Sequence, residues 1–266
     1  MLDTVQAVTF IKKMSNGKTM PLLMQCLQEN NNLIDVVVKL SCKCERKEIA
    51  LASEAVCSML ATDLGLLTPE PFLVEINPNV INQELFPEIY DDISNSSRIA
   101  FGSKLLPNNF GIFNFISDSN LQSAMDIFSF DALILNSDRR ENNPNCKSDG
   151  HSIAIFDHDI ALSSTNDLGS SFLIPYPWDI GALNHMKAGN SKHILYKYLH
   201  NKNMSINKFE NEFLKLGPLR LEKYINALPQ EWVAKKDIIL SIVEYLELAI
   251  QKWSFLRLEI ERVLNA

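Results

Sequence analysis

Residues 130–163 constrain the fold most, because a dense polar cluster lies there between two apolar segments. An apolar segment with helical periodicity leads into the polar run 136–143, NSDRRENN. After a short loop, the run 152–156, SIAIF, ends in the triplet 157–159, Asp-His-Asp. The pattern predicts a helix, a polar loop and a short strand, with acidic side chains after the helix and after the strand. Two acidic groups with an Asn between them suit magnesium-dependent phosphoryl transfer.

The spacing within this stretch is informative. Asp138 and Asn143 have the five-residue offset of a protein-kinase catalytic loop, in which the Asp accepts the hydroxyl proton and the Asn holds a metal ion. Asp157 follows a strand, as a second metal ligand does in that pattern, and Asp159 is an alternative to it. The usual sequence around these positions is absent, since Asn-Ser precedes Asp138 and His158 follows Asp157. An ordinary turn is the competing interpretation, because Asp and Asn are common in turns.

Lys39 is a candidate phosphate ligand. It ends a β-branched run, VVVK, whose alternation predicts that its side chain faces away from Val38 and Leu40. A lysine that is buried there needs an anionic partner, and otherwise it is an exposed residue at a strand end. Glu54 is the expected partner and Glu48 the competing acid, because both lie on the helix predicted over 46–65.

Local patterns outline the rest of the chain. Strands are expected at 8–11, 20–26, 33–40 and 99–106, and residues 77–98 are expected to be rich in loops. Residues 107–111 predict a hinge between a small N-terminal lobe and a helical C-terminal lobe, with one long helix over 235–264. The expected fold is therefore α+β and two-lobed: residues 1–106 form a small antiparallel sheet with one helix, and residues 107–266 form a mainly helical lobe.

Composition excludes several classes of protein. The formal net charge of −7 disfavours general nucleic-acid binding. No apolar run reaches the roughly 18 residues of a membrane span, and residues 1–14 do not resemble a signal peptide. Five cysteines without framework spacing indicate reduced thiols and a cytoplasmic location. Cys42 and Cys44 have no second ligand pair at zinc spacing, so a structural zinc site is disfavoured.

The motifs together resemble the HipA-like kinase family, within the wider group that shares a fold with phosphatidylinositol kinases. The resemblance rests on FDALILNSDRRENNPN followed by IAIFDHDIAL, with support from VVVKL, EAVCSMLATDLGLLTPEP and FGSKLL. These segments keep their order from about residue 17 to residue 162, and the chain looks most like the shorter, uncharacterised branch of the family.

The resemblance implies a two-lobed kinase-like fold that binds ATP and Mg²⁺ and phosphorylates a hydroxyl group, with a protein Ser or Thr as the favoured acceptor. Asp138 would be the catalytic base, and Asn143 and Asp157 (alternatively Asp159) would hold the metal. Lys39, with Glu54 as its partner, would contact the α- and β-phosphates. The remaining nucleotide contacts would come from Gly17, Lys18, Thr19, Phe101, Ser103 and Leu105.

Three alternatives stay open at this point. The acceptor can be a small molecule or lipid instead of a protein, because the sequence does not define an acceptor groove. The loop at 15–19 can be an ordinary hairpin turn. A non-catalytic nucleotide-binding or antitoxin-type module would keep the fold without turnover, whereas a metallohydrolase is disfavoured because His151 and His158 lack ligand spacing. Arg139 and Arg140 can pair with phosphate, with local carboxylates, or with solvent.

Overall fold

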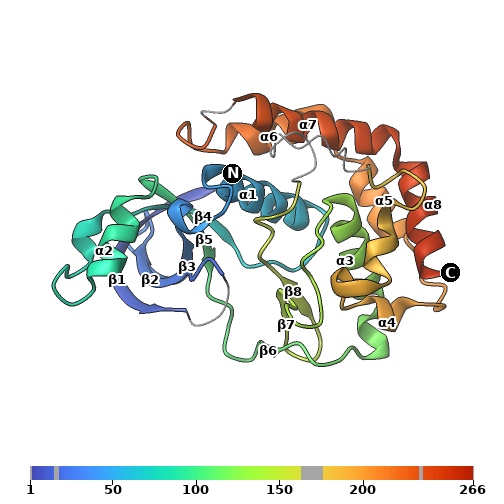
Figure 1. Cartoon of the computed structure of the whole chain (residues 1–266), viewed down its shortest axis with the longest axis horizontal. Coiled ribbons are helices and arrows are strands. Elements are labelled where there is room, and N and C mark those ends of the chain that lie inside the picture. The colour runs from blue at the N-terminus through green and yellow to red at the C-terminus, as the bar shows by residue number, and fades with distance from the viewer. Residues whose placement is uncertain (1, 15–17, 163–175, 234–235, 266) are drawn as a thin grey trace.

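The computed structural model describes residues 2–14, 18–162, 176–233 and 236–265. A five-stranded barrel lies at one end of the molecule and a group of helices at the other, with a small three-stranded sheet between them (Figure 1). The chain is therefore a mixed α and β protein, as expected.

The N-terminal strands close into a barrel in the order β1-β2-β3-β5-β4. Their bounds are β1 Asp3–Lys13, β2 Leu22–Leu27, β3 Leu33–Lys39, β4 Pro71–Glu75 and β5 Ile99–Lys104. Four of the five pairings are antiparallel, whereas β1 and β4 pair in parallel from Asp3↔Phe72 to Gln6↔Glu75. The expected small antiparallel sheet is thus corrected to a closed barrel with one parallel pairing, which joins distant segments and is not encoded in local sequence patterns.

The barrel interior is filled by alternate side chains of its strands. Apolar residues from all five strands form this core: Val5, Ala7, Leu22, Met24, Cys26, Val36, Val38, Phe72, Val74 and Ala100. Gly102 faces the same interior, where an added Cβ would lie 2.4 Å from Val74 Cγ2 and 2.6 Å from Val36 Cγ1. The close approach of these strands therefore requires a residue without a side chain at position 102.

Helix α1 (Glu48–Asp63) lies between the barrel and the helices that follow. It contacts β4 and β5 on one side and two C-terminal helices on the other. Twelve of the 16 residues of α1 are buried, including Glu54, so its sequence shows apolar character on several faces. A second short helix, α2 (Pro87–Ser94), lies in the excursion between β4 and β5. The expectation of one helix in residues 1–106 is therefore wrong, because Pro87 opens a short amphipathic helix in a segment rich in loop-forming residues.

The stretch 121–159 contains the expected helix and strand. Helix α3 (Leu121–Leu133) ends just before the polar run 136–143. The small sheet has the order β6-β7-β8, with β6 Gly111–Ile112, β7 Cys146–Ser148 and β8 Ile153–Ile155. β8 leads directly into Asp157, which adopts a left-handed backbone with φ 66°.

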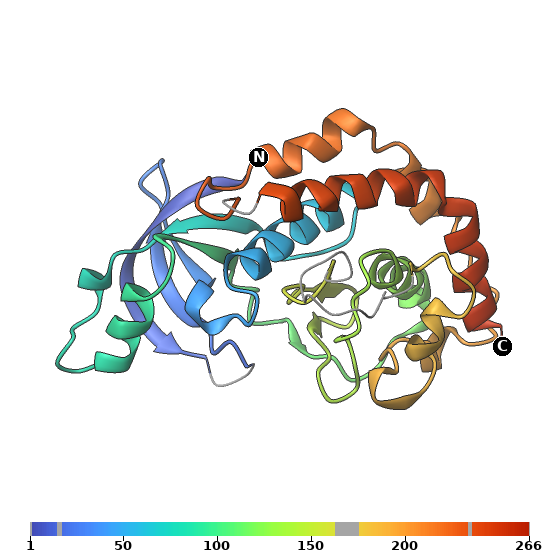
Figure 2. The ribbon, with the colours of Figure 1, turned by 45° about the horizontal axis from the view of Figure 1, so that its top comes forward.

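The C-terminal part is helical. It contains α4 Tyr196–Leu199, α5 Asn207–Leu214, α6 Pro218–Asn226, α7 Lys236–Gln251 and α8 Trp253–Leu264. The single helix expected over 235–264 is two helices that meet at Lys252. Helices α6 and α7 pass over α1 toward the barrel (Figure 2). None of the helices in the described ranges combines the length and apolar character needed to cross a membrane.

Candidate functional site

Lys39 lies at the end of β3, on the outer face of the barrel, and its ammonium contacts three carboxylates. Lys39 Nζ lies 2.9 Å from Glu54 Oε2 and forms a hydrogen-bonded ion pair with Asp157 Oδ1. Asp159 Oδ2 lies 3.7 Å from the same nitrogen. The expected pairing of Lys39 with Glu54 is present, and Lys39 is buried, as a strand residue covered by α1 should be.

Glu54 joins helix α1 to the loop after β8. Its Oε1 accepts a hydrogen bond from the Asp157 N–H at 3.1 Å, and its Oε2 accepts one from the His158 N–H at 2.7 Å. Arg46, just before α1, donates to the carbonyl oxygens of Asp159 and Ala161. The position of the loop 157–161 is therefore set by Glu54 of α1 and by Arg46 just before that helix.

The cluster around Lys39 holds more negative than positive charge. One ligand oxygen from each of Glu54, Asp157 and Asp159 lies within 4.8 Å of the others, and Lys39 is the cation that lies among them. Burial raises the pKa of Glu54 to about 7 against the opposing charge of Lys39, and burial also raises the pKa of Asp159. Burial acts the same way on Asp157, but the charge and hydrogen bond of Lys39 outweigh it and lower the pKa of Asp157. A divalent cation would relieve this excess of carboxylate charge.

Asp138 is held in the polar loop by its neighbours. Its Oδ1 accepts a hydrogen bond from Arg140 Nη2 at 2.5 Å, and its Oδ2 accepts from Asn143 Nδ2 at 2.6 Å and from Asn145 Nδ2 at 3.2 Å. The Asp138 side chain is 20% exposed, so one edge of the carboxylate remains accessible. The five-residue offset thus brings Asn143 into direct contact with Asp138.

Arg139 connects the polar loop to the loop after β8. It is 1% exposed, which excludes the interpretations that place its side chain in solvent or on a phosphate. Its Nη1 donates to the carbonyl of Asn145 and, at 3.4 Å, to that of Phe156, whereas its Nε lies 2.5 Å from Asp131 Oδ2. Arg139 therefore spans the two segments that present Asp138 and Asp157.

Asp131 and two histidines complete this buried network. Asp131 accepts hydrogen bonds from Asn136 Nδ2 at 2.8 Å and from His193 at 2.8 Å. His193 Nδ1 accepts from the Leu195 N–H, so its proton lies on Nε2 and is donated to Asp131. Sequence reasoning did not single out Asp131 or His193. The sequence feature that could have identified Asp131 is its position as an acid within the apolar part of α3, because a buried carboxylate requires a hydrogen-bonding or charged partner.

His158 is a neutral, fully buried ring between Arg139 and Glu54. Arg139 Nη2 lies 3.2 Å from its Nε2, so Nε2 accepts and Nδ1 carries the proton. Burial, with the positive charge of Arg139, lowers the pKa of His158 to about 3. Its Nδ1 lies 3.7 Å from Glu54 Oε1 and has no hydrogen-bond partner among the described residues. The His158 ring therefore fills the space between Arg139 and Glu54.

The expected nucleotide contacts are only partly brought together. Phe101 pairs across the strands with Lys39 and shares its face, but Phe101 is 1% exposed and belongs to the core beneath α1. Ser103 is half-buried two residues further along that face. Leu105 is also half-buried, and its N–H donates to the Asp35 carbonyl.

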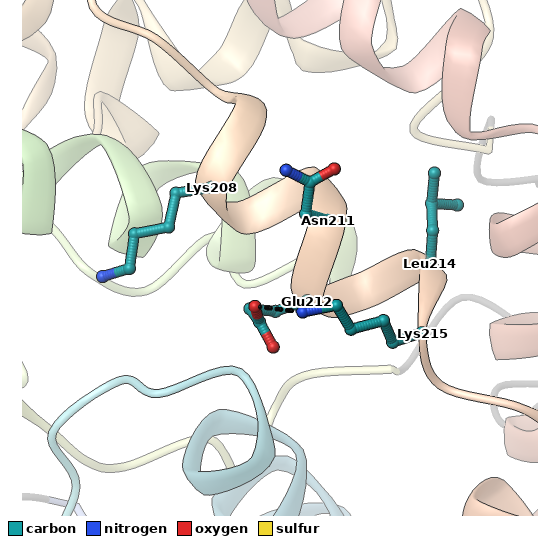
Figure 3. A pocket seen from close by; sticks show the side chains of 5 residues that line it. All are labelled: Lys208, Asn211, Glu212, Leu214 and Lys215. Carbon is teal, nitrogen blue, oxygen red and sulfur yellow. Dashed lines mark hydrogen bonds and ion pairs between the residues drawn. The ribbon is translucent and has the colours of Figure 1, made fainter.

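The loop expected over the phosphates joins β1 to β2. Lys18 is exposed and Thr19 is half-buried on a turn, whereas Gly17 lies outside the described residues. A separate hollow on α5 is lined by Lys208, Asn211, Glu212, Leu214 and Lys215 (Figure 3). It contains none of the residues described above, and its Lys215 is paired with Glu212 at 2.7 Å.

A family model described as HipA-like kinase matches residues 7–252. The chain belongs to the HipA-like kinase family. Among solved structures, this HipA-like kinase is similar to the crystal structure of the Helicobacter pylori proinflammatory kinase CtkA. The TM-score is 0.50 and the sequence identity 16%, over 96% of each chain, so this likeness concerns the fold alone. No curated protein matches the HipA-like kinase described here.

Proposed function

We propose that this HipA-like kinase transfers the γ-phosphate of ATP, in the presence of Mg²⁺, to a hydroxyl group. The observation that carries the proposal is the convergence of Lys39 with Asp157 and Asp159, next to the loop that presents Asp138. Kinases need a cation on the nucleotide phosphates, oxygen ligands for a metal ion, and an acid group for the acceptor hydroxyl. Lys39 at the end of β3, together with the acidic side chains of the loops after α3 and β8, supports the proposal that these groups fill the three roles.

The residues divide into distinct roles. Lys39, kept in place by Glu54, would contact the α- and β-phosphates, and Lys18 and Thr19 would cover them. Asp138 would accept the proton of the acceptor hydroxyl once a hydrogen bond from Arg140 or Asn143 is released. Ser103, on the strand that carries Phe101, and Leu105, just after that strand, would contact the base. Gly17 remains a proposed contact from sequence alone.

Magnesium fits the residues around Lys39. Asp157 and Asn143 would hold it, with Asp159 as the alternative ligand, because Glu54 already accepts three hydrogen bonds. The ion would neutralise the phosphate oxygens during transfer. Oxygen ligands of this kind suit a hard divalent cation.

We also propose a two-lobed division, with residues 1–106 as the N-terminal lobe and residues 107–266 as the C-terminal lobe. The barrel and α1 carry Lys39 and Glu54, whereas Asp138, Asn143 and Asp157 follow α3 and β8. A cytoplasmic location is supported by the free cysteines, four of which are buried as thiols. A protein Ser or Thr is the favoured acceptor.

Transfer of labelled γ-phosphate tests the proposal. Asp138→Asn should lower kcat by about 10²–10⁴-fold, because it removes the proton acceptor. Glu141→Gln makes the same change on an exposed carboxylate of the same loop and should leave kcat unchanged. Equal rates for wild type and Asp138→Asn would overturn the role of Asp138.

The acceptor class needs a parallel screen. Purified protein should be incubated with labelled ATP and Mg²⁺, together with peptide libraries, small hydroxyl compounds or lipid vesicles. Label on Ser or Thr residues supports the favoured acceptor, whereas label only on a small molecule or lipid assigns the other class. Stabilisation by ATP with no transfer to any acceptor would favour a non-catalytic nucleotide-binding module.

A further inference from the structure

Helices α6 and α7 return from the helical end of the molecule to the barrel and contact α1 (Figure 2). Three separate contacts fix them there. Each contact involves an element that leads to a proposed site residue, although no residue of α6 or α7 belongs to the site.

The first contact joins α6 to the end of α1. Arg220 donates from two nitrogens to both oxygens of Asp63, with Nε 2.5 Å from Oδ2. The Tyr224 hydroxyl donates to the same Oδ2 at 2.5 Å. Asp63 is the last residue of α1, the helix that carries Glu54. A bidentate arginine fixes direction as well as distance, so α6 restrains the orientation of α1.

The second contact joins the loop after α6 to β5. The Ile99 N–H donates to Glu231 Oε1 at 2.6 Å, and the Trp232 indole N–H donates to the Ile99 carbonyl at 2.9 Å. The pairing of β5 with β3 ends at Lys39↔Phe101, so Ile99 has no β3 residue opposite it. Side chains of the α6–α7 loop thus take the hydrogen bonds that a longer β3 would have made. Trp232 is 1% exposed, so this contact is part of the core.

The third contact joins α7 to the end of α3. The Tyr245 hydroxyl donates to the carbonyl of Leu133, three residues before Asn136. Tyr245 and Leu133 are both buried in the same core as α1. The α3 end leads into Asn136, whose Oδ1 accepts from the Asp138 N–H at 3.1 Å. Helix α7 therefore restrains the segment that presents Asp138.

We propose that α6 and α7 form a brace that sets the position of α1, and hence Glu54, relative to the loop of Asp138. Arg220, Trp232 and Tyr245 are its positioning residues. This assignment rests on the proposed function, in which Glu54 positions Lys39 to contact the nucleotide phosphates. When the brace loosens, α1 spends less time where Glu54 reaches Lys39, and nucleotide binding must shift α1 back.

This coupling has a kinetic signature. If Arg220→Ala reduces the properly placed fraction of α1 to about a tenth, the apparent KM for ATP rises about tenfold, while kcat at saturating ATP stays near wild type. A merely structural role would instead reduce the amount of active protein, which lowers the apparent kcat and leaves KM unchanged. Trp232→Phe keeps an aromatic side chain but removes the pyrrole ring and its N–H donor to Ile99, and it should move KM in the same direction.

Arg257→Ala is the matched control. Arg257 on α8 pairs with Glu210 of α5 and with Glu261, so its loss breaks comparable ion pairs within the helical part alone. Its KM should equal that of wild type. Amide hydrogen exchange without nucleotide provides a second readout, because Arg220→Ala should speed exchange in 56–63 and 99–101 and Arg257→Ala should not.

The two readouts separate the brace from the kinase activity. If wild type neither binds nor turns over ATP, the proposed function fails, and the exchange data alone decide the brace. Faster exchange in α1 of Arg220→Ala, but not of Arg257→Ala, supports the brace. Unchanged exchange in α1 of both Arg220→Ala and Trp232→Phe overturns it, whatever the activity.

Discussion

Arg139 and Asp131 form an ion pair in the protein interior, with Arg139 Nε 2.5 Å from Asp131 Oδ2 and both side chains fully buried. The guanidinium also reaches the carbonyl oxygens of Asn145 and Phe156, and the carboxylate accepts from Asn136 and His193. A buried pair of this kind contributes little net stability by itself, but the loss of one partner leaves an uncompensated charge. Its structural effect is to hold the loops of Asp138 and Asp157 together.

Replacement of Arg139 should therefore destabilise the protein strongly. We expect Arg139→Met to lower the free energy of unfolding by about 3–5 kcal/mol, because Asp131 remains buried without its cation. Lys197→Met, which breaks the exposed pair with Glu141, should cost less than about 1 kcal/mol. Urea denaturation of both variants measures the difference. A cost for Arg139→Met as small as that for Lys197→Met would show that water or rearrangement compensates Asp131.

Removal of Lys39 should create a requirement for a divalent cation. Lys39→Met leaves Glu54, Asp157 and Asp159 together without the ammonium, so the variant should melt at a lower temperature than wild type in a chelator. Saturating Mg²⁺, at about 100 times its dissociation constant, should recover about 2.7 kcal/mol. Lys104→Met, which removes an exposed lysine from the same barrel, is the control. Equal responses of Lys39→Met and Lys104→Met to Mg²⁺ would argue against a metal site here.

Acid should destabilise the protein through His158. Burial and Arg139 lower the pKa of His158 from 6.5 to about 3, so between these values the unfolded chain binds a proton that the folded chain does not. The contribution of neutral His158 to the free energy of unfolding is complete above pH 6.5 and is lost as the pH falls toward 3. Its slope reaches about 1.4 kcal/mol per pH unit.

Unfolding in urea from pH 4 to 6 measures this slope. His158→Gln should reduce the slope of the unfolding free energy against pH by the equivalent of about one bound proton relative to wild type. Replacement of the exposed His151 by Gln should leave the slope unchanged. The raised pKa of Glu54 has the opposite effect between pH 4.5 and about 7, which is why the comparison is made between variants. Identical slopes for wild type and His158→Gln would mean that His158 is protonated in the folded protein.

Gly102 should resist substitution for reasons of space. Gly102→Ala brings a methyl group into contact with Val74 and Val36 in the barrel core, and we expect it to cost about 1–3 kcal/mol of unfolding free energy. Gly111→Ala has no heavy atom within 4 Å of the added Cβ and should be close to neutral. Thermal unfolding of the two variants checks this. Similar melting temperatures would show that the barrel widens without strain.

Local patterns predict part of this structure well. The run before Lys39 is β-branched and α1 is apolar on several faces, so both elements and the pairing of Lys39 with Glu54 follow from sequence. The spacing of Asp138 and Asn143 also predicts their proximity, because five residues of turn keep their side chains close. The sequence-based assignment of individual catalytic and metal roles remains a proposal that the variants above would test.

Other features depend on contacts between distant segments. The parallel pairing of β1 with β4 joins residues far apart in the chain, and no turn signal marks it. The burial of Arg139 depends on Asp131, His158 and His193, which come from α3, from the loop after β8 and from the segment before α4. Helix α2 was missed because it is short and begins at Pro87 within a polar segment, and the break at Lys252 lies within an uninterrupted apolar periodicity.

The closed ring of five strands also bears on how the chain emerges during synthesis. β1 is made first, but its parallel partner β4 follows only after β2, β3 and α1 have been made. Until then β1 presents an unpaired backbone edge, which is the kind of surface that joins strands of neighbouring chains into aggregates. Pairing across such a separation is also slow to form. When residues 71–75 pair with β1, the free edges move to β3 and β4, and the ring closes only after β5 (residues 99–104) has been made and pairs with both. The vulnerable period therefore belongs to the nascent chain and ends with this closure.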